Sequence, residues 1–139
     1  MRVLALDLGT RRIGVAVSDR SGTLASPLTV LTRTGDRRRD HEAIRRLVEE
    51  EEAERVVVGL PLSLDGTVGP AAKGAIAEAD EMASVVGVPV ETFDERLTTV
   101  TAERDLRQLQ MRAEARRRVI DKVAAAVMLQ SWLDARERP

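Results

Sequence analysis

The chain has 139 residues, of which 43% are hydrophobic and 32% charged, and its formal net charge at pH 7 is −1. These values predict a soluble globular protein with one domain over residues 1–139. The absence of cysteine excludes thiolate metal sites and cysteine nucleophiles, and the single histidine, His41, excludes multi-histidine zinc sites. No signal peptide is recognisable and no apolar run approaches the roughly 20 residues of a membrane span, so we expect a cytoplasmic protein without membrane contact.

Charge is unevenly distributed along the chain. Residues 40–54 have a net charge of −5, and residues 107–122 have a net charge of +4. Twenty of the 22 basic residues are arginine, whose planar fork suits phosphate oxygens. One Phe, one Trp and no Tyr leave almost nothing with which to build an aromatic platform for single-stranded bases. We therefore expect a polarised surface.

Five segments have the patterns of strands. The first three are joined by short turns and predict an antiparallel meander, and two of the five are continuous apolar runs typical of strands covered on both faces. In chain order the segments are Val3–Leu6, Ile13–Ser18, Leu24–Leu31, Val56–Gly59 and Val88–Phe93.

Helical spacing of apolar residues follows the meander and alternates with the last two strands. Helices are predicted over Asp36–Glu52, from Pro70 to a C-terminal cap at Gly87, from Thr98 or Thr99 to about Gln110, and over about Val119–Arg136, with a basic connector at Arg112–Arg118. The order predicts an α/β fold: a mixed five-stranded sheet, part meander and part parallel, flanked by helices.

Three acidic residues stand in unusual settings. Asp7 ends an apolar strand on the same face as Val3 and Ala5, where an isolated carboxylate is costly to desolvate. Asp121 begins an apolar helix face, and Glu95 follows a strand end, where sites collect in α/β sheets. Each acid also has an ordinary reading: a turn cap for Asp7, a favourable helix start for Asp121, and an exposed loop acid for Glu95.

Taken together, the three acids predict a metal site. Carboxylates without histidine or cysteine favour a hard cation, Mg²⁺ or Mn²⁺, and a pair of such ions can cleave a phosphodiester by in-line displacement. The neighbouring cations are compatible with an anionic substrate or with a solvated loop; they are Arg116, Arg117, Arg118 and Lys122.

Three further features are weaker candidates. The loop Gly59–Thr67 follows a buried strand and either contacts a nucleic-acid backbone or only joins strand to helix. Lys73, one turn into the next helix, is a candidate phosphate contact. His41 lies beside an acidic helix start and is expected at the surface rather than in catalysis.

The motifs resemble those of the YqgF/RuvX family. The segment Asp7–Asp19 is similar to the family's opening signature. Three later segments resemble its other motifs in the same order: Gly59–Pro61 with Asp65–Thr67, Asp94–Thr99, and Asp121–Ala125. The resemblance covers Met1 to about Leu133. Ser63 departs from the asparagine common in the family loop, which removes a side-chain amide contact but leaves the acids intact.

The resemblance implies an RNase H-like fold and a two-metal-ion nuclease that matures the 5′ end of 16S ribosomal RNA or resolves Holliday junctions. Asp7, Glu95 and Asp121 are then the catalytic metal ligands, with Asp7 bridging both ions. Arg11, Arg12 and Arg96 face the substrate backbone. Asp94 and Asp65 are the candidates for a fourth acid.

Two other classes compete with a nuclease on structured RNA or branched DNA. An Asp-Leu-Gly-Thr hairpin also resembles actin-like phosphotransferases, but these close two domains over ATP and the chain has the length of one. A non-catalytic nucleic-acid-binding module is disfavoured by acids at all three positions. The sequence leaves open RNA or DNA as substrate, and monomer or a dimer without disulfides.

Overall fold

A computed structural model describes residues 1–61, 65–94 and 113–137 of the chain. The elements in these ranges are β1 (Val3–Leu8), β2 (Arg12–Ser18), β3 (Ala25–Thr32), α1 (Arg37–Glu50), β4 (Arg55–Leu60), α2 (Pro70–Val86), β5 (Val90–Asp94) and α4 (Ala113–Glu137).

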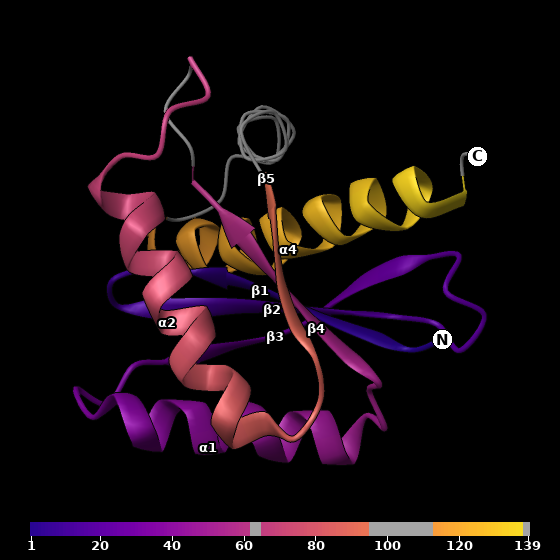
Figure 1. Ribbon diagram of the computed structural model, residues 1–139, viewed down its shortest axis with the longest axis horizontal. Coiled ribbons are helices and arrows are strands. Elements are labelled where there is room, and N and C mark those ends of the chain that lie inside the picture. The colour runs from indigo at the N-terminus through magenta and orange to yellow at the C-terminus, as the bar shows by residue number, and fades with distance from the viewer. Residues whose placement is uncertain (62–64, 95–112, 138–139) are drawn as a thin grey trace.

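The strands form one mixed sheet in the order β3-β2-β1-β4-β5 (Figure 1). β1, β2 and β3 pair antiparallel, and β4 joins β1 and β5 in parallel. The predicted meander and mixed five-stranded sheet are therefore confirmed. β3 is an edge strand, and its pairing with β2 shifts register between Val15 and Ala16, opposite Pro27.

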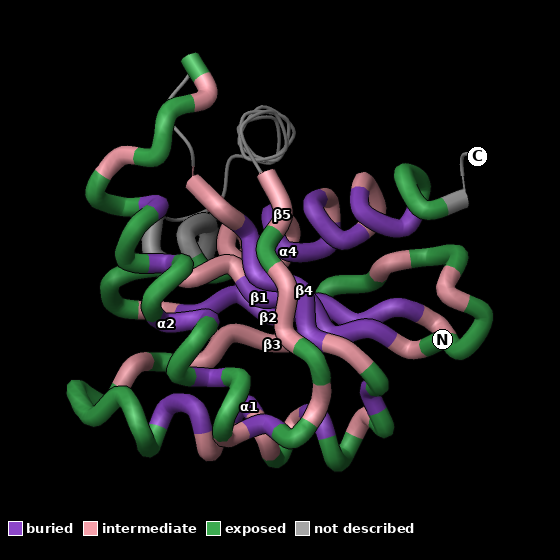
Figure 2. Tube along the Cα trace, viewed as in Figure 1, coloured by how far each residue is buried: buried purple, intermediate pink, exposed green. Residues whose placement is uncertain are grey.

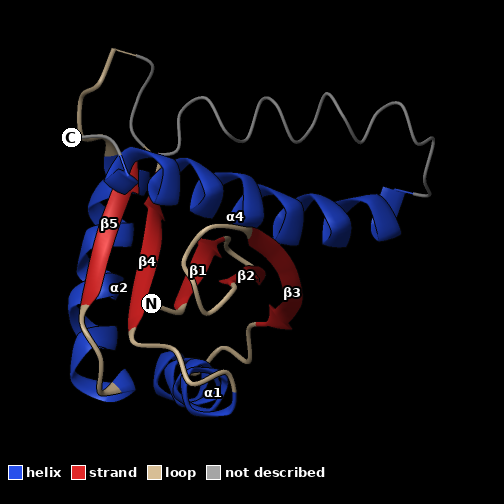
Figure 3. Cartoon of the chain, turned by 90° about the vertical axis from the view of Figure 1, so that its right-hand side faces the viewer, coloured by secondary structure: helices blue, strands red, loops and turns tan. Residues whose placement is uncertain are grey.

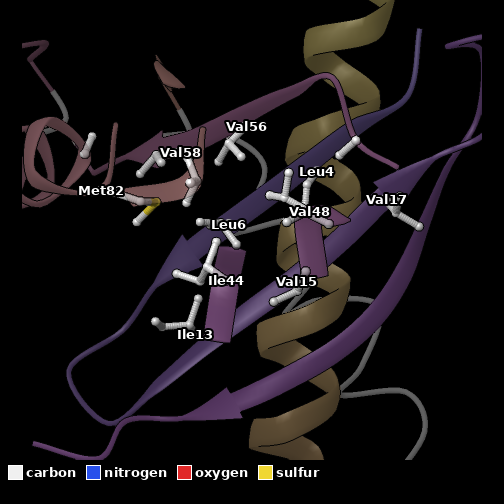
Figure 4. Close-up of a cluster of buried hydrophobic side chains, with 13 residues drawn as sticks. Leu4, Leu6, Ile13, Val15, Val17, Ile44, Val48, Val56, Val58 and Met82 are labelled. Atoms are coloured by element: carbon white, nitrogen blue, oxygen red, sulfur yellow. The ribbon is translucent and has the colours of Figure 1, made fainter. Parts of the chain in front are cut away.

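Helices cover both faces of the sheet. Figure 3 shows α4 along one face and α1 below the other, with α2 beside α1. The α1/α2 side holds the larger core, shown in Figure 4, in which Leu4, Leu6 and Val15 of the sheet meet Ile44 of α1 and Met82 of α2. The tube in Figure 2 shows this burial concentrated in the central strands.

The α4 side holds a second core with a different composition. Small sheet residues, Val3, Ala5 and Ala16, allow α4 to approach closely, and Met128 and Trp132 of the helix pack over them. Alternation along β1 and β2 assigns residues to the two faces as the sequence predicted, because successive side chains of a strand point to opposite sides.

Two helix predictions need correction. α4 begins at Ala113, so the predicted basic connector Arg112–Arg118 is wrong for residues 113–118, which are helical. Arginine is a good helix former, so a run of it at the surface prolongs a helix. In α2 the apolar residue Ile76 is exposed, contrary to what helical spacing with Ala72 and Ala79 indicates, whereas Glu78 is buried. Gly87 ends α2 with a φ of 75°, as its predicted capping role requires. The helix predicted from Thr98 or Thr99 lies outside the described residues.

No helix in the described part of the chain is both long and apolar enough to cross a membrane.

Gly14→Ala should destabilise the protein strongly. A Cβ at residue 14 would lie well inside van der Waals distance of the backbone carbonyl of Asp121, and two packed backbones cannot move apart without cost. We expect a loss of about 2 kcal/mol or more in the free energy of unfolding in urea. The control is Gly74→Ala in α2, where a Cβ meets nothing within 4 Å and helix propensity should add up to about 1 kcal/mol. Equal stabilities for the two variants would contradict the close contact.

Candidate active site

Asp7 and Asp121 are brought to the same place by one glycine. Asp7 pairs with Gly14 in the β1–β2 register, so both residues lie on the α4 face of the sheet. Gly14 in turn lies directly against the backbone of Asp121 in α4. The absence of a side chain at residue 14 therefore lets a helix residue approach the strand end that carries Asp7.

Arg12 holds the carboxylate of Asp121. Its Nε donates a hydrogen bond to Asp121 Oδ2 at 2.7 Å, and the two side chains are 26% and 24% exposed. Arg12 was predicted to face the substrate backbone, and in the structure its Nε is hydrogen-bonded to a predicted metal ligand. The two residues are 109 positions apart in sequence, so no local pattern indicates the pair.

The turn between β1 and β2 is fixed from the other side of the sheet. Gly9 N donates to Arg12 O at 2.9 Å, and Arg33, just after β3, donates from its backbone N to Arg11 O at 2.8 Å. Arg33 Nε also donates to Gly9 O at 2.7 Å. Arg33 thus ties the end of β3, which it follows directly, to the turn beside Asp7.

Arg33 is itself anchored to a buried carboxylate. Its two terminal nitrogens donate to the two oxygens of Glu78 in α2 at 2.9 Å each. His41 Nε2 of α1 lies 2.8 Å from Glu78 Oε2, and Arg37 approaches Glu78 Oε1 at 3.7 Å. Glu78 and His41 are only 3% and 2% exposed. The network connects the turn, β3, α1 and α2.

The expectation that His41 is a surface residue is wrong, because its ring is buried against Glu78. Sequence analysis missed Glu78 and Arg33 altogether. A signal was present: Glu78 lies among the apolar positions of α2, one turn before Met82, as Asp121 lies on the apolar face of α4.

The remaining predicted site residues are dispersed. Arg11 in the turn, Lys73 in the first turn of α2 and Arg118 in α4 are exposed, and Lys122 is half-buried. Glu95 and Arg96 lie outside the described residues, and for Arg116 and Arg117 the structure describes only the helical backbone.

The candidates for a fourth acid differ in their surroundings. Asp94 is the last residue of β5. Asp65 accepts hydrogen bonds from the backbone N and the hydroxyl of Thr67, at 3.0 and 2.7 Å, as in an Asx turn.

The donor atoms fit a hard divalent cation. Asp7 and Asp121 supply carboxylate oxygens from two elements packed together, the ligand type that Mg²⁺ and Mn²⁺ favour. Within residues 1–61, 65–94 and 113–137, no group of three His, Cys, Asp or Glu side chains is placed to hold a metal. The two described aspartates therefore fit as part of a ligand set whose third predicted member, Glu95, lies outside those ranges.

The order of the strands, the helix α4 across one face of the sheet and the acid at the end of β1 are those of an RNase H-like fold. Thermus thermophilus RuvC, solved with a Holliday junction substrate, has this fold: its TM-score is 0.58 at 19% identity, covering 99% of this chain and 97% of that one. The sequence profile of the RuvX family, described as a Holliday junction resolvase, matches residues 1–135. The chain belongs to the RuvX family, a family of hydrolases that cleave phosphodiester bonds.

Relatives cover the chain nearly completely. A Myxococcus xanthus protein named "Putative pre-16S rRNA nuclease" is 47% identical over 139 residues, which are all of this chain and 91% of the relative. A Mycobacterium ulcerans protein of the same name is 50% identical over 97% of this chain and 79% of the relative. The predicted family and the RNase H-like fold are confirmed, which leaves the actin-like phosphotransferase without support.

Glu78→Gln should destabilise the protein by about 3 kcal/mol or more, because removal of one partner from a buried ion pair leaves charged Arg33 uncompensated. The control is Glu81→Gln on the same helix, whose side chain is 52% exposed and pairs with the exposed Arg37, so its loss should stay below about 1 kcal/mol. Chemical denaturation measures both. Equal effects would refute the network's importance.

The same variant tests a pH dependence. Burial raises the pKa of Glu78. Hydrogen bonds from Arg33 and His41 and the charges of Arg33 and Arg37 together lower this pKa by more than burial raises it, so it lies below its ordinary value of 4.5. A carboxyl with a lowered pKa stabilises the fold above its ordinary pKa, and that stability is lost as the pH falls through the folded-state pKa. Wild type should therefore lose more stability below about pH 4.5 than Glu78→Gln does.

Proposed function

We propose that this protein is a metal-dependent endonuclease that matures the 5′ end of 16S ribosomal RNA. The observation that carries the proposal is the packing of Asp121 against Gly14, the register partner of Asp7. Support comes from the names of its relatives, which are nucleases for the precursor of that RNA.

In this proposal Asp7, Glu95 and Asp121 hold the divalent ions, Mg²⁺ or Mn²⁺. Bound ions of this kind activate water and stabilise the leaving oxygen of a phosphodiester. Asp7 lies near the end of β1 and Asp121 in the first half of α4. These two ligands are therefore on regular secondary structure and not on loops.

Arg12 orients Asp121 in this arrangement. Its hydrogen bond to Oδ2 fixes the rotation of the carboxylate, and among the described residues the other oxygen, Oδ1, has no hydrogen-bond partner. Arg12 is therefore a positioning residue for a metal ligand. Removing a hydrogen bond that orients a metal ligand typically changes metal affinity or activity about 10- to 100-fold.

Substrate contacts are proposed for cations around this edge. Arg11 is exposed in the turn beside Asp7, and Arg118 and Lys122 flank Asp121 on α4. Arg12, Lys73, Arg96, Arg116 and Arg117 complete the set predicted from sequence. A phosphate backbone is the ligand that such a collection of cations favours.

A four-way DNA junction is the second candidate substrate. The family's description as a Holliday junction resolvase supports it. Symmetric cleavage of a junction needs two active sites, so mass measurement of the protein with bound junction distinguishes a dimer from a monomer.

Asp7→Asn should abolish metal-dependent cleavage of precursor RNA and of a four-way junction. We expect a loss of more than about 100-fold, since changes in groups that only support a metal ligand already cost up to that much. The control is Asp80→Asn, an exposed acid on α2, which should cleave like wild type. Cleavage by wild type in excess chelator would contradict the mechanism, and comparison of the two substrates identifies the preferred one.

Asp121→Asn should lose cleavage while the protein stays folded. The Arg12–Asp121 pair is partly exposed, and pairs of this kind contribute about 0–1 kcal/mol to stability. A matched control is Asp134→Asn, an exposed acid further along α4. Single-turnover cleavage and thermal unfolding are the measurements; a folded, fully active Asp121→Asn protein would remove Asp121 from the site.

A further inference from the structure

α1 carries charges opposite to those that stabilise a helix. Its first three residues are Arg37, Arg38 and Arg39, all exposed, and its last two are Glu49 and Glu50. The helix dipole favours anions at the N-terminus and cations at the C-terminus, so this order weakens the helix. The charge pattern of α1 therefore needs an explanation other than the stability of the helix.

The two ends of α1 differ in how their charges are compensated. At the acidic end, Glu49 is hydrogen-bonded to Arg45 at 2.7 Å and Glu51 to Arg2 at 3.0 Å. At the basic end, neither Arg38 nor Arg39 makes an ion pair with any residue that the structure describes. Glu42, one turn after Arg38, is hydrogen-bonded to Arg45 instead, at 2.8 Å.

The arginines without an ion pair lie at the same edge of the molecule as Asp7. β1 ends and β2 begins at this edge, and β3 ends there immediately before α1 starts (Figure 1). Arg11 of the β1–β2 turn and Arg37 of α1 line one hollow of about 480 Å³, together with Thr10, Gly35 and Asp40. Arg37 therefore continues the cationic turn beside the site, and Arg38 and Arg39 follow it in the first turn of α1.

The helix N-terminus itself is already satisfied. The side chain of Asp36 accepts hydrogen bonds from the backbone N of Arg38 at 3.0 Å and of Arg39 at 3.4 Å. The Asp40 carboxylate accepts from the backbone and hydroxyl of Thr34, at 3.0 and 2.9 Å. Anion binding at this end thus depends on the arginine side chains and not on free backbone donors.

We propose that Arg11, Arg37, Arg38 and Arg39, here called the α1 arginine surface, bind the phosphates of a nucleic-acid segment flanking the cleaved bond. This inference rests on the proposed function, and it extends substrate contact to the helix layer opposite α4 (Figure 3). A strand that crosses the Asp7 edge meets Arg118 and Lys122 of α4 on one face and the α1 arginine surface on the other.

A nucleic acid fits this surface better than an acidic protein. Protein interfaces need a core of buried apolar or aromatic anchors. The exposed large hydrophobic residues in the described ranges are Met1, Leu24, Val68 and Ile76, and none belongs to the α1 arginine surface or to the hollow. Arginine forks on a polar surface match phosphate oxygens.

The test replaces Arg38 and Arg39 together by glutamine. The matched control is Arg20→Gln with Arg46→Gln, which removes the same charge: Arg46 is exposed in the middle of α1, and Arg20 pairs with Glu52 away from this edge. The affinity of each full-length protein for a four-way DNA junction and for an RNA stem is titrated over a range of salt concentrations, in chelator so that no cleavage occurs.

Each lost phosphate contact should reduce the slope of log affinity against log salt by about 0.9, so the double variant should lose about 1.8 and the control should match wild type. A lowered slope on one probe alone supports the surface and identifies its nucleic acid. An unchanged slope on both probes, or an equal fall of the slope in the control, overturns the proposal. If the double variant keeps the nucleic-acid affinity of wild type, the α1 arginine surface is then to be tested for an acidic protein partner.

Cleavage assays with metal separate this proposal from the nuclease itself. The double variant should show a raised KM at unchanged kcat, because its arginines contact flanking phosphates and not the reacting group. If wild type binds with the expected salt dependence but cleaves neither probe, the proposed function fails while the binding surface stands. If kcat falls and KM does not, flanking contact is refuted.

Discussion

The close contact between β2 and α4 at Gly14 is the constraint on which the site depends. A strand and a helix meet backbone to backbone only where a side chain is missing, and here that position pairs with Asp7 and faces Asp121. Residues separated by more than a hundred positions are thereby held together by packing rather than by a flexible loop. The second core, with Ala5, Ala16 and Trp132, holds α4 in place around this contact.

On the opposite face of the sheet, ion pairs rather than packing hold the turn between β1 and β2. Both terminal nitrogens of Arg33 donate hydrogen bonds to Glu78, and Nε of Arg33 donates to the carbonyl of Gly9. A buried carboxylate in α2 therefore determines where the turn after Asp7 lies. Buried ion pairs contribute little net stability but are costly to break, which favours one arrangement over near alternatives. The edge of the sheet that carries Asp7 is thus held from both faces.

Local patterns predicted the sheet and half of the site. Alternation in β1 placed Asp7 on the face of Val3 and Ala5, because strand geometry depends on near neighbours. Ion pairs between distant elements have no such pattern: neither Arg12 with Asp121 nor His41 with Glu78 could be read from spacing. The start of α4 was misplaced because a run of charged residues suits an exposed helix as well as a loop.

β3 borders the sheet and therefore has an unpaired edge, yet it is poorly suited to recruit another chain. Proline has no N–H to offer an incoming strand, and Pro27 lies where the ladder with β2 shifts register. Bulges and prolines at such borders discourage intermolecular β-pairing and fibril growth. The irregularity opposite Val15 and Ala16 therefore disfavours the pairing of a second chain along this edge.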